Sequence, residues 1–353
     1  MKDFKQNVDF FIKNSKNFYN DSFLENIDKK HQSIVGEAYK SIETSFSIDK
    51  IRNWSGQSDH TPHFKVTKLL RFLVGDYSHK LKLFNKILTF FRSKFTNQKF
   101  TLSGLLDDIS IIEILGGSDL LLNNPQDKSP GSDSKDKING YSVSHRWLRY
   151  IYILNQIINK KLICNNMIWV DIGSFYGGLQ GLVRRYFPKS KIVMVDFHHQ
   201  LLRSYLYLNE LHPNSIHILP NDLKKYNSFD DLPDNCFVYI PVNEFNYIKN
   251  FRCHLFTNFY SFGEMKREYF LNYFNSNLLK SADKIYMVNR FVSSPFFEKT
   301  YDSDLNYNDY IIKNRVPIYF DIFPMGHYLI IPRNLFGRDY FRNISSSYFE
   351  IIY

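Results

Sequence analysis

The pattern of apolar and polar residues divides the chain into regions of different texture. In residues 1–115, apolar residues recur at spacings of three and four, as from Val8 to Ile12, with Lys and Asn between them. This spacing is typical of amphipathic helices. Residues 116–140 are rich in Gly, Ser, Asp, Asn and Pro, a composition typical of a loop. We therefore expect a helical N-terminal region, a linker or lid loop at 116–140, and a third region at 141–353.

The third region alternates apolar runs of strand length with helical segments. A helix is expected from Val143 to Lys160, with Ser142 or Ser144 as its N-cap. The apolar runs Met167–Gly173 and Lys191–Asp196 have the composition of parallel strands that are covered on both faces. Further elements are expected as a helix at 198–211, strands at 215–219, 236–241, 254–258 and 284–288, and a final hairpin at 318–332. This alternation predicts an α/β fold built on a mostly parallel, doubly wound sheet.

The strongest chemical signal is a glycine-rich segment, Asp171 to Gly178, between the first expected strand and a helix. Gly173 and Gly177 allow the backbone to turn tightly and to approach a ligand closely, and the helix start offers N–H groups. Asp196 ends the next strand, where its carboxylate can accept both hydroxyls of a ribose. The segment therefore predicts a site for a cofactor that carries a nucleoside.

Two classes of cofactor compete for such a loop. A dinucleotide requires G-x-G-x-x-G, whose second glycine lets the backbone contact a pyrophosphate. Phe175 stands at that position, and a bulky side chain there disfavours a pyrophosphate. S-adenosylmethionine (SAM) has no phosphate, is cationic at sulfur and ends in an amino acid group, so a carboxylate such as Asp171 suits it. The loop therefore favours SAM.

The same segments resemble class I SAM-dependent methyltransferases and, more narrowly, a family of bacterial sugar O-methyltransferases. The matching segments lie within residues 138–295 and are VDIGSFYGGL (Val170–Leu179), MVDFHHQLLRSYLYL (Met194–Leu208), FTNFYSFGEM (Phe256–Met265) and the strand end Asn289-Arg290. The resemblance implies a Rossmann-like class I methyltransferase fold with SAM as the cofactor. It further implies methyl transfer to a hydroxyl of a sugar, glycan or sugar nucleotide, in a surface polysaccharide (capsule or lipopolysaccharide) or its precursor. Family members often carry Gln in place of Gly263 and Pro-Glu in place of His198-His199, so the substrate side of the pocket is expected to differ.

The resemblance also implies roles for individual residues. The methionine part of the cofactor would be lined by Asp171, Gly173, Tyr176 and Gly177. The ribose and adenine would be held by Asp196 and Phe197, and the adenine edge by Asn243 and Glu244, with Asn221 and Asp222 as the alternative pair. After the fourth strand, Asn258 would lie beside the cofactor, and the substrate would meet Tyr260 and Ser261.

Methyl transfer to a hydroxyl requires a base for its proton. Glu264 is placed there by the resemblance, and His327 is a second candidate from outside the resembling segment. Each has a structural alternative: Glu264 could complete a helix-capping box with Ser261, and His327 could be a buried core histidine. Two interpretations are open for three residues before the first strand: they contact an anionic substrate, or they belong to a solvated surface. These residues are His145, Arg146 and Arg149.

Composition and charge bear on the partners and the cellular location of the protein. The formal net charge of +10 and the pI of about 9.2 would favour proximity to an anionic polymer or a membrane surface, or simply reflect a solvated surface. The three cysteines are far apart and the adjacent His198 and His199 would point apart on a helix, so no metal site is expected. The N-terminus lacks a signal-peptide pattern, and no apolar run reaches the about 18–20 residues of a spanning helix. We expect a reduced, cytoplasmic protein whose helical N-terminal region could form a homo-oligomer or cover the pocket.

Two other functions are compatible with the same residues. The first is methylation of a nucleic acid or another small molecule, although the position after the fourth strand reads NFYS rather than (D/N)PP(Y/F) and no Pro-Cys nucleophile is present. The second is a non-catalytic scaffold with this fold in a glycan-assembly complex. The intact set of Asp171, Gly173 and Asp196 disfavours the scaffold, because a degenerate site would be free to lose these residues.

Overall fold

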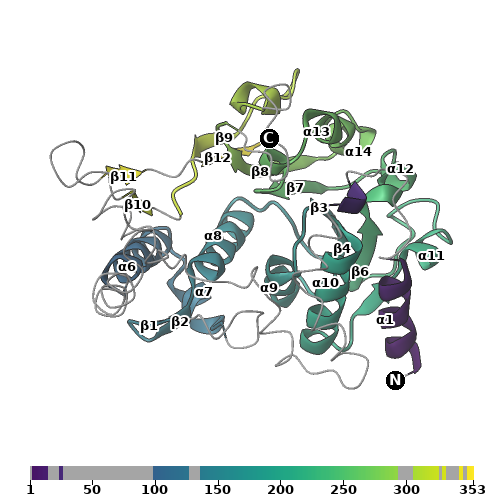
Figure 1. Ribbon diagram of the computed structural model, residues 1–353, viewed down its shortest axis with the longest axis horizontal. Coiled ribbons are helices and arrows are strands. Elements are labelled where there is room, and N and C mark those ends of the chain that lie inside the picture. Colours follow the sequence, from purple (N-terminus) through teal and green to yellow (C-terminus); the bar gives the residue numbers. More distant parts are fainter. Residues whose placement is uncertain are drawn as a thin grey trace, which may run out of the picture.

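The computed structural model describes residues 2–14, 24–26, 98–126, 136–292, 305–325, 328–330, 342–344 and 348–353. A central eight-stranded sheet has the order β5-β6-β4-β3-β7-β8-β12-β9 (Figure 1). Its strands are β3 (Ile168–Ile172), β4 (Lys191–Asp196), β5 (Ile216–Ile218), β6 (Cys236–Pro241), β7 (Leu255–Phe259), β8 (Lys284–Arg290), β9 (Tyr319–Ile322) and β12 (Tyr348–Ile352). The first six strands in this order, from β5 across β6, β4, β3 and β7 to β8, pair in parallel. The strand β12 lies antiparallel between β8 and β9.

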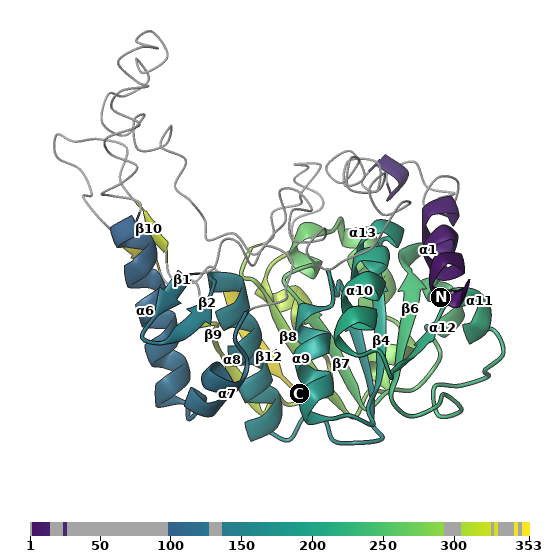
Figure 2. The same ribbon diagram turned by 90° about the horizontal axis from the view of Figure 1, so that it is seen from below.

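Helices cover both faces of this sheet. Figure 2 shows one layer as a row of helices, which are α6 (Gln98–Ile114), α8 (His145–Asn159), α9 (Gly178–Tyr186), α10 (His198–Leu211) and α1 (Lys2–Asn14). The opposite face carries the short helices α11 (Pro220–Leu223), α12 (Phe245–Ile248), α13 (Arg267–Phe274) and α14 (Asn277–Lys280), whose apolar side chains share one core with it. This confirms the predicted fold class, a Rossmann-like α/β arrangement with a doubly wound, mostly parallel sheet.

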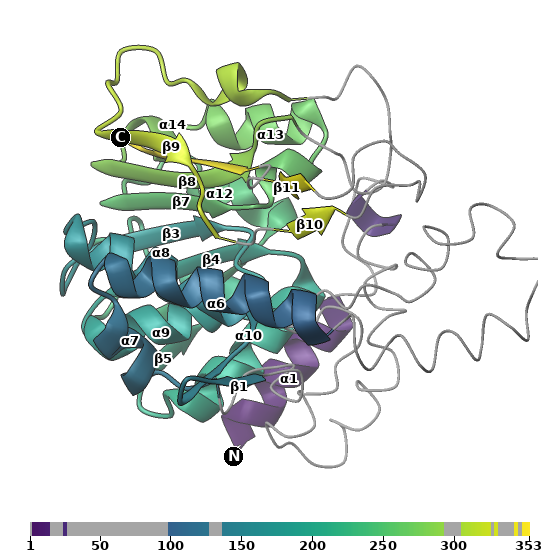
Figure 3. The same cartoon turned by 90° about the vertical axis from the view of Figure 1, so that its left-hand side faces the viewer.

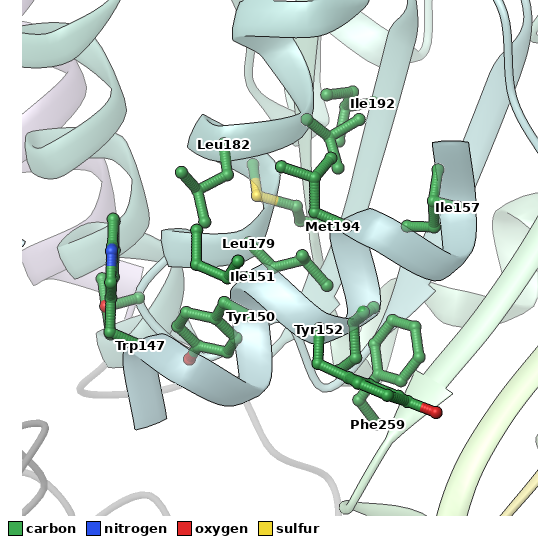
Figure 4. Packing of buried hydrophobic residues seen from close by; sticks show 14 of the residues in the cluster. Trp147, Tyr150, Ile151, Tyr152, Ile157, Leu179, Leu182, Ile192, Met194 and Phe259 are labelled. Carbon is green, nitrogen blue, oxygen red and sulfur yellow. The ribbon is translucent and has the colours of Figure 1, made fainter. Parts of the chain in front are cut away.

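The central strands are continuously apolar because alternate side chains enter two different cores. On β3, Trp169 packs toward α8, α9 and α10, while Val170 packs toward α13 and α14. On β4, Met194 enters the first core together with Ile151 of α8 and Leu179 of α9 (Figure 4). A strand buried on both faces has no polar side to show in its sequence. The runs 191–196 and 236–241 were for this reason predicted with the bounds that the structure has.

The helix before β3 also agrees with its prediction. It begins at His145, and its N-cap is Ser144, whose hydroxyl oxygen accepts a hydrogen bond from the Trp147 N–H at 3.3 Å. Such a cap satisfies one of the N–H groups that the first helical turn leaves without an internal partner. Figure 3 shows α6 lying over α8, so the first turn of α8 is held between α6 and the sheet.

The predicted hairpin at 318–332 is wrong. The strand β9 pairs antiparallel with β12 at the chain's end, while β10 (Tyr328–Ile330) pairs with β11 (Arg342–Ile344). The sequence did not predict β12, because Glu350 interrupts its short apolar run. That carboxylate is fully buried and accepts hydrogen bonds from the hydroxyls of Tyr152 at 2.7 Å and Tyr286 at 3.1 Å. The hydrogen bonds from these two tyrosines, which belong to distant elements, offset the cost of burying the Glu350 carboxyl inside the sheet.

The N-terminal region and the linker are described in part. The helix α1 packs on α10, where Phe4 and Phe11 contact the ring of Tyr205. In the segment 116–140, residues 118–123 form the helix α7, which packs on α8, and the small hairpin of β1 (Asp136–Ile138) and β2 (Tyr141–Val143) follows. Most of the predicted helical stretch between α1 and α6 lies outside the described residues. Within the described part of the chain, no helix is both long enough and apolar enough to cross a bilayer.

Candidate active site

The sheet topology selects one edge for ligand binding. The chain runs from β3 to β4 on one side, whereas β7 lies on the other side of β3. In open α/β sheets, ligands bind outside the carboxyl ends of the strands at such a reversal of strand order. Gly173 follows β3, Asp196 is the last residue of β4 and is followed by Phe197, and Tyr260–Glu264 follow β7. The structure therefore brings these sequence-predicted segments to the same edge.

The loop after β3 depends on its glycines for conformation and for packing. Gly173 and Gly177 have φ angles of 82° and 84°, in the left-handed region that side chains disfavour. A Cβ atom at position 173 would also overlap the side chain of Ser261, which follows β7. Gly177 is the N-cap of α9. The first glycine therefore allows the loop after β7 to close onto the loop after β3.

Asp196 ties the end of β4 to this glycine loop. Its Oδ2 accepts the backbone N–H of Phe175 at 2.7 Å, and its Oδ1 accepts the N–H of Phe197 at 2.7 Å. The residue is only 8% exposed. These two bonds set the orientation of the carboxylate at the carboxyl end of β4.

The register of the neighbouring strand favours one of the two candidate pairs for the adenine edge. In the parallel pairing of β4 with β6, Asp196 lies opposite Pro241, so the turn that carries Asn243 and Glu244 begins beside it. Asn221 and Asp222 instead follow β5, at the outer edge of the sheet and one strand further away. The arrangement favours Asn243 and Glu244.

Asp171 lies beneath the loop rather than in it. Its side chain, 2% exposed, accepts hydrogen bonds from the hydroxyl of Thr257 on β7 and the amide of Gln180 on α9, both at 2.5 Å. Burial, together with the smaller effect of the negative charge of Asp196, raises the pKa of this carboxyl to about 8, although the two hydrogen bonds oppose the shift. Asp171 thus fastens β3 to β7 and to the start of α9.

Tyr176 is likewise a core residue. Its ring is fully buried and contacts the rings of Tyr150 on α8 and Tyr207 on α10, with centroids 6.1 and 5.1 Å apart. Asp171 and Tyr176 were expected to line the methionine part of a cofactor. In the structure both side chains are buried and support the loop from below.

Two buried asparagines connect the glycine loop to the turn after β7. The Asn258 amide donates to the Ile172 carbonyl at 2.7 Å and to the Ser261 hydroxyl at 2.5 Å. Its carbonyl oxygen accepts from the Asn289 amide of β8 at 2.9 Å and from the Phe262 N–H at 3.0 Å. All four hydrogen-bonding positions of this fully buried amide are therefore used inside the protein. Asn258, expected beside the cofactor, positions the turn that carries Ser261.

That turn presents Glu264 at the edge of the sheet. Residues 262–264 form a single 3₁₀ turn, Ser261 makes no capping bond, and the next helix begins only at Arg267, so the capping-box alternative is wrong. The Glu264 carboxylate lies 3.8 Å from the Arg290 guanidinium, and its side chain is 40% exposed. Partial withdrawal from water raises the pKa of this carboxyl, and the charges of Arg290 and Arg146 oppose the shift. Glu264 is a solvent-accessible carboxylate between cations.

Two aromatic residues at this edge have strained backbones. Phe175 after β3 and Tyr260 after β7 have φ angles of 56° and 71°, which are uncommon for bulky residues and often mark functional sites. Each ring is covered by an arginine from the first turns of α8: Arg146 lies 4.5 Å from the Phe175 centroid, and Arg149 lies 5.5 Å from that of Tyr260. The start of α8 thus packs over both loops.

The remaining candidates lie elsewhere. His145 is buried and its Nδ1 lies 3.0 Å from Asp108 Oδ2 of α6, so it joins two helices and does not belong to a solvated surface; its contact with a substrate stays a prediction. His327 lies outside the described residues. His198 and His199 are buried at the start of α10, and no group of three His, Cys, Asp or Glu side chains with metal-site geometry occurs in the described part of the chain.

Sequence reasoning missed several residues that shape the site. Gln180 and Thr257 hold Asp171, Asn289 holds Asn258, and the Tyr348 hydroxyl of β12 accepts a hydrogen bond from Arg290 Nε at 3.0 Å. Asn289 was noted in the sequence only as part of the resembling strand end Asn289-Arg290, and no role was predicted for it. Tyr348 gave none, because its strand was not predicted.

Comparisons with known proteins return structures only. No family model matches the chain, and no curated protein matches it either. Among similar solved structures, geranyl diphosphate C-methyltransferase from Streptomyces coelicolor A3(2), solved with S-adenosyl-L-homocysteine, is 12% identical, with a TM-score of 0.36 over 67% of this chain and 85% of that one. A protein assigned as an RNA methyltransferase from Pyrococcus horikoshii is 14% identical, with a TM-score of 0.33 over 57% and 82%. The pyocyanin biosynthetic protein PhzM is 13% identical, with a TM-score of 0.27 over 39% and 36%.

The match spans 36% of the length of PhzM, and it spans 60% and 51% of two further similar structures, a protein assigned as a sarcosine dimethylglycine methyltransferase from Galdieria sulphuraria and a second structure of geranyl diphosphate C-methyltransferase. Similarities of this extent do not indicate which reaction the protein catalyses. The proposal for the reaction therefore rests on the residues of the site.

Proposed function

We propose that this protein is a SAM-dependent O-methyltransferase that acts on a sugar hydroxyl of a bacterial surface polysaccharide or its precursor. The observation that carries the proposal is the bond between Asp196 and the glycine loop at the switch point of the sheet. It holds a carboxylate acceptor beside a loop in which glycines keep the backbone open to a ligand.

The polar groups at this edge suit SAM. The Asp196 carboxylate would accept the ribose hydroxyls, and Phe197 with Asn243 and Glu244 would bound the adenine. The loop from Gly173 to Gly177 would face the methionine part. In this loop Ser174 is buried and its hydroxyl has no hydrogen-bond partner among the described residues, as expected of a group that a ligand completes.

The same bond disfavours a dinucleotide. A pyrophosphate site uses N–H groups of the glycine loop as donors. The N–H of Phe175, the residue in place of the second glycine, already donates to Asp196. The backbone group that a pyrophosphate would need is therefore used inside the protein.

When bound, SAM supplies an electrophilic methyl group, and the residues of this chain have to hold the acceptor and take its proton. Glu264 is the accessible carboxylate on the substrate side, and its raised pKa makes it a stronger base than an ordinary glutamate. Ser261 and Tyr260 border the same turn, where they would position the sugar ring. The sugar itself as substrate comes from the resemblance of residues 138–295 to sugar O-methyltransferases.

The test is a search for the cofactor and then for the acceptor. Purified protein should bind SAM or S-adenosylhomocysteine by calorimetry, and methyl-labelled SAM should transfer its label to a carbohydrate fraction of the native host. NAD should not bind, which controls for a general nucleoside site. If the protein binds SAM and transfers the label to nucleic acid but not to carbohydrate, the substrate is a nucleic acid and not a sugar. If neither SAM nor its product binds, the proposal is wrong.

A further inference from the structure

A cavity of about 270 Å³ lies at the outer edge of the sheet, away from the glycine loop. Its walls come from the end of α6, from α8, and from β9 with the residues after it. The loops after β3, β4 and β7, which form the candidate active site, contribute nothing to it. We propose that this cavity binds a small organic cation, an ammonium ion on a short apolar body, at a site separate from the candidate active site.

A buried amide in the cavity wall has an acceptor to offer. Gln156 of α8 is 7% exposed, and its Nε2 donates to the Tyr152 hydroxyl at 2.9 Å. That hydroxyl gives its single proton to Glu350 at 2.7 Å, so it can only accept from the amide, which fixes the orientation of Gln156. The Gln156 Oε1 then has no hydrogen-bond partner among the described residues. A ligand that completes this buried group has to donate a hydrogen bond.

Two carboxyl groups make this part of the fold negative. In the register of β9 with β12, Asp321, which lines the cavity, lies directly opposite the buried Glu350. Like charges in such cross-strand positions destabilise a sheet. Burial, and to a smaller extent the charge of Asp321, raises the pKa of Glu350, although hydrogen bonds from three tyrosine hydroxyls oppose the shift. A cation bound beside Asp321 would relieve this repulsion.

The protein's own cations do not neutralise the cavity. Neither Asp321 nor Glu350 has an ion pair with a described residue, and no Lys, Arg or His is among the described residues that line the cavity. Lys160, the C-cap of α8, instead places its Nζ 4.5 Å from the centroid of the Tyr319 ring. This contact shows that a ring of the cavity wall attracts a positive charge. The polar groups therefore favour a cationic donor and disfavour an anion.

The apolar part of the wall defines the rest of the ligand. It consists of Ile111, Ile114, Leu115, Ile322 and Pro324. Ile114 and Ile322 are 83% and 47% exposed, so a hydrocarbon body that covers them removes apolar surface from water. The volume lies just below the range of about 300–1,000 Å³ that is typical of small-molecule sites. A compact amine, with one short chain or one ring, matches both the size and the lining.

The first experiment tests the charge of the ligand with three probes of equal chain length. Hexylammonium, hexanol and hexanoate are titrated against the wild-type protein at neutral pH, and their affinities are measured by ligand-observed NMR. We expect hexylammonium to bind at least about tenfold more tightly than hexanoate, with hexanol between them. Equal affinities would show that the cavity selects only for apolar surface, and no binding or a preference for hexanoate would equally overturn the proposal. None of these outcomes depends on whether the protein binds SAM.

The second experiment places the ammonium group. Asp321→Asn should weaken hexylammonium binding about tenfold, because a charge-assisted hydrogen bond is lost, and should leave hexanol binding unchanged. The residue is exposed, so the fold should persist. The matched control is Asp283→Asn, an exposed carboxylate that pairs with Arg252 away from the cavity, and it should bind hexylammonium like the wild type. Unchanged hexylammonium binding in Asp321→Asn would contradict the proposal.

The third experiment places the apolar body. Ile322→Trp fills the mouth of the cavity and should abolish binding of both hexylammonium and hexanol. Ile318→Trp is the matched control, because Ile318 is also exposed beside β9 but does not line the cavity, and it should bind both probes normally. Saturating S-adenosylhomocysteine should not displace hexylammonium from the wild type. Displacement, or normal binding in Ile322→Trp, would place the amine outside this cavity and overturn the proposal.

Discussion

The backbone N–H of Phe175 donates a hydrogen bond to the Asp196 carboxylate at 2.7 Å, although 21 residues separate them. This bond joins the loop after β3 to the end of β4, so one acidic side chain both shapes the glycine loop and stands where a ribose would bind. The two roles can be separated by substitution, because a side chain without charge can keep one of them.

Asp196→Asn should weaken binding of S-adenosylhomocysteine by about tenfold, and Asp196→Ala by more. The asparagine retains one carbonyl oxygen for the Phe175 N–H but loses the second acceptor, whereas alanine loses both. Calorimetric titration measures the difference. The control is Asp222→Ala, which removes the exposed acidic residue that follows β5 and should bind like the wild type. A loss of affinity in the Asp222 variant instead would move the ribose site to the outer strand.

Gly173→Ala should destabilise the protein by more than the conformational cost of a left-handed alanine, which is about 1 kcal/mol. The added Cβ would overlap Ser261, so the loops after β3 and β7 would have to separate. Gly140→Ala is the matched control, because Gly140 has the same left-handed conformation, φ 84°, with no atom within 4 Å of an added Cβ. Denaturant unfolding of the two variants gives the contribution of the overlap as their difference. Equal losses would mean that Ser261 does not press on Gly173.

Asp171→Asn should change how stability depends on pH. The folded-state pKa of Asp171 is raised to about 8, well above that of an unfolded chain, so its contribution is fully present in acid and is lost as the pH rises toward 8. The free energy of unfolding of the variant, relative to the wild type, should therefore increase between pH 5 and pH 8, by at most about 1.4 kcal/mol per pH unit, and then level off. The Gln180 amide can rotate to accept the new N–H, because its Oε1 has no hydrogen-bond partner among the described residues. A difference that is flat with pH would show that Asp171 is ionised throughout this range.

The sequence predicted most strands of the central sheet, but not β12 and not the directions of the side chains. The run 191–196 was identified because both faces of a central strand are apolar, whereas β12 was not, because its charged Glu350 is compensated by Tyr152 and Tyr286 from elsewhere in the chain. At the site, the pattern placed polar residues at the correct strand ends. It could not show that Asp171 shares the face of Trp169 and points under the helices, since that depends on Thr257 and Gln180, which lie on other elements.

Glu264→Gln should lower kcat at least about a hundredfold while leaving the affinity for S-adenosylhomocysteine near that of the wild type. In the proposed reaction the carboxylate takes the proton of the acceptor hydroxyl, and the isosteric amide cannot, although it keeps the volume of the side chain beside Arg290. In the wild type, activity should fall as the pH is lowered through the raised pKa of Glu264, and this acidic limb should be absent from the residual activity of the variant. Glu268→Gln, in the first turn of α13, is the control for loss of a nearby negative charge and should keep the wild-type profile. If Glu264→Gln retains both the turnover and the acidic limb, the base is another group and Glu264 only orients Arg290.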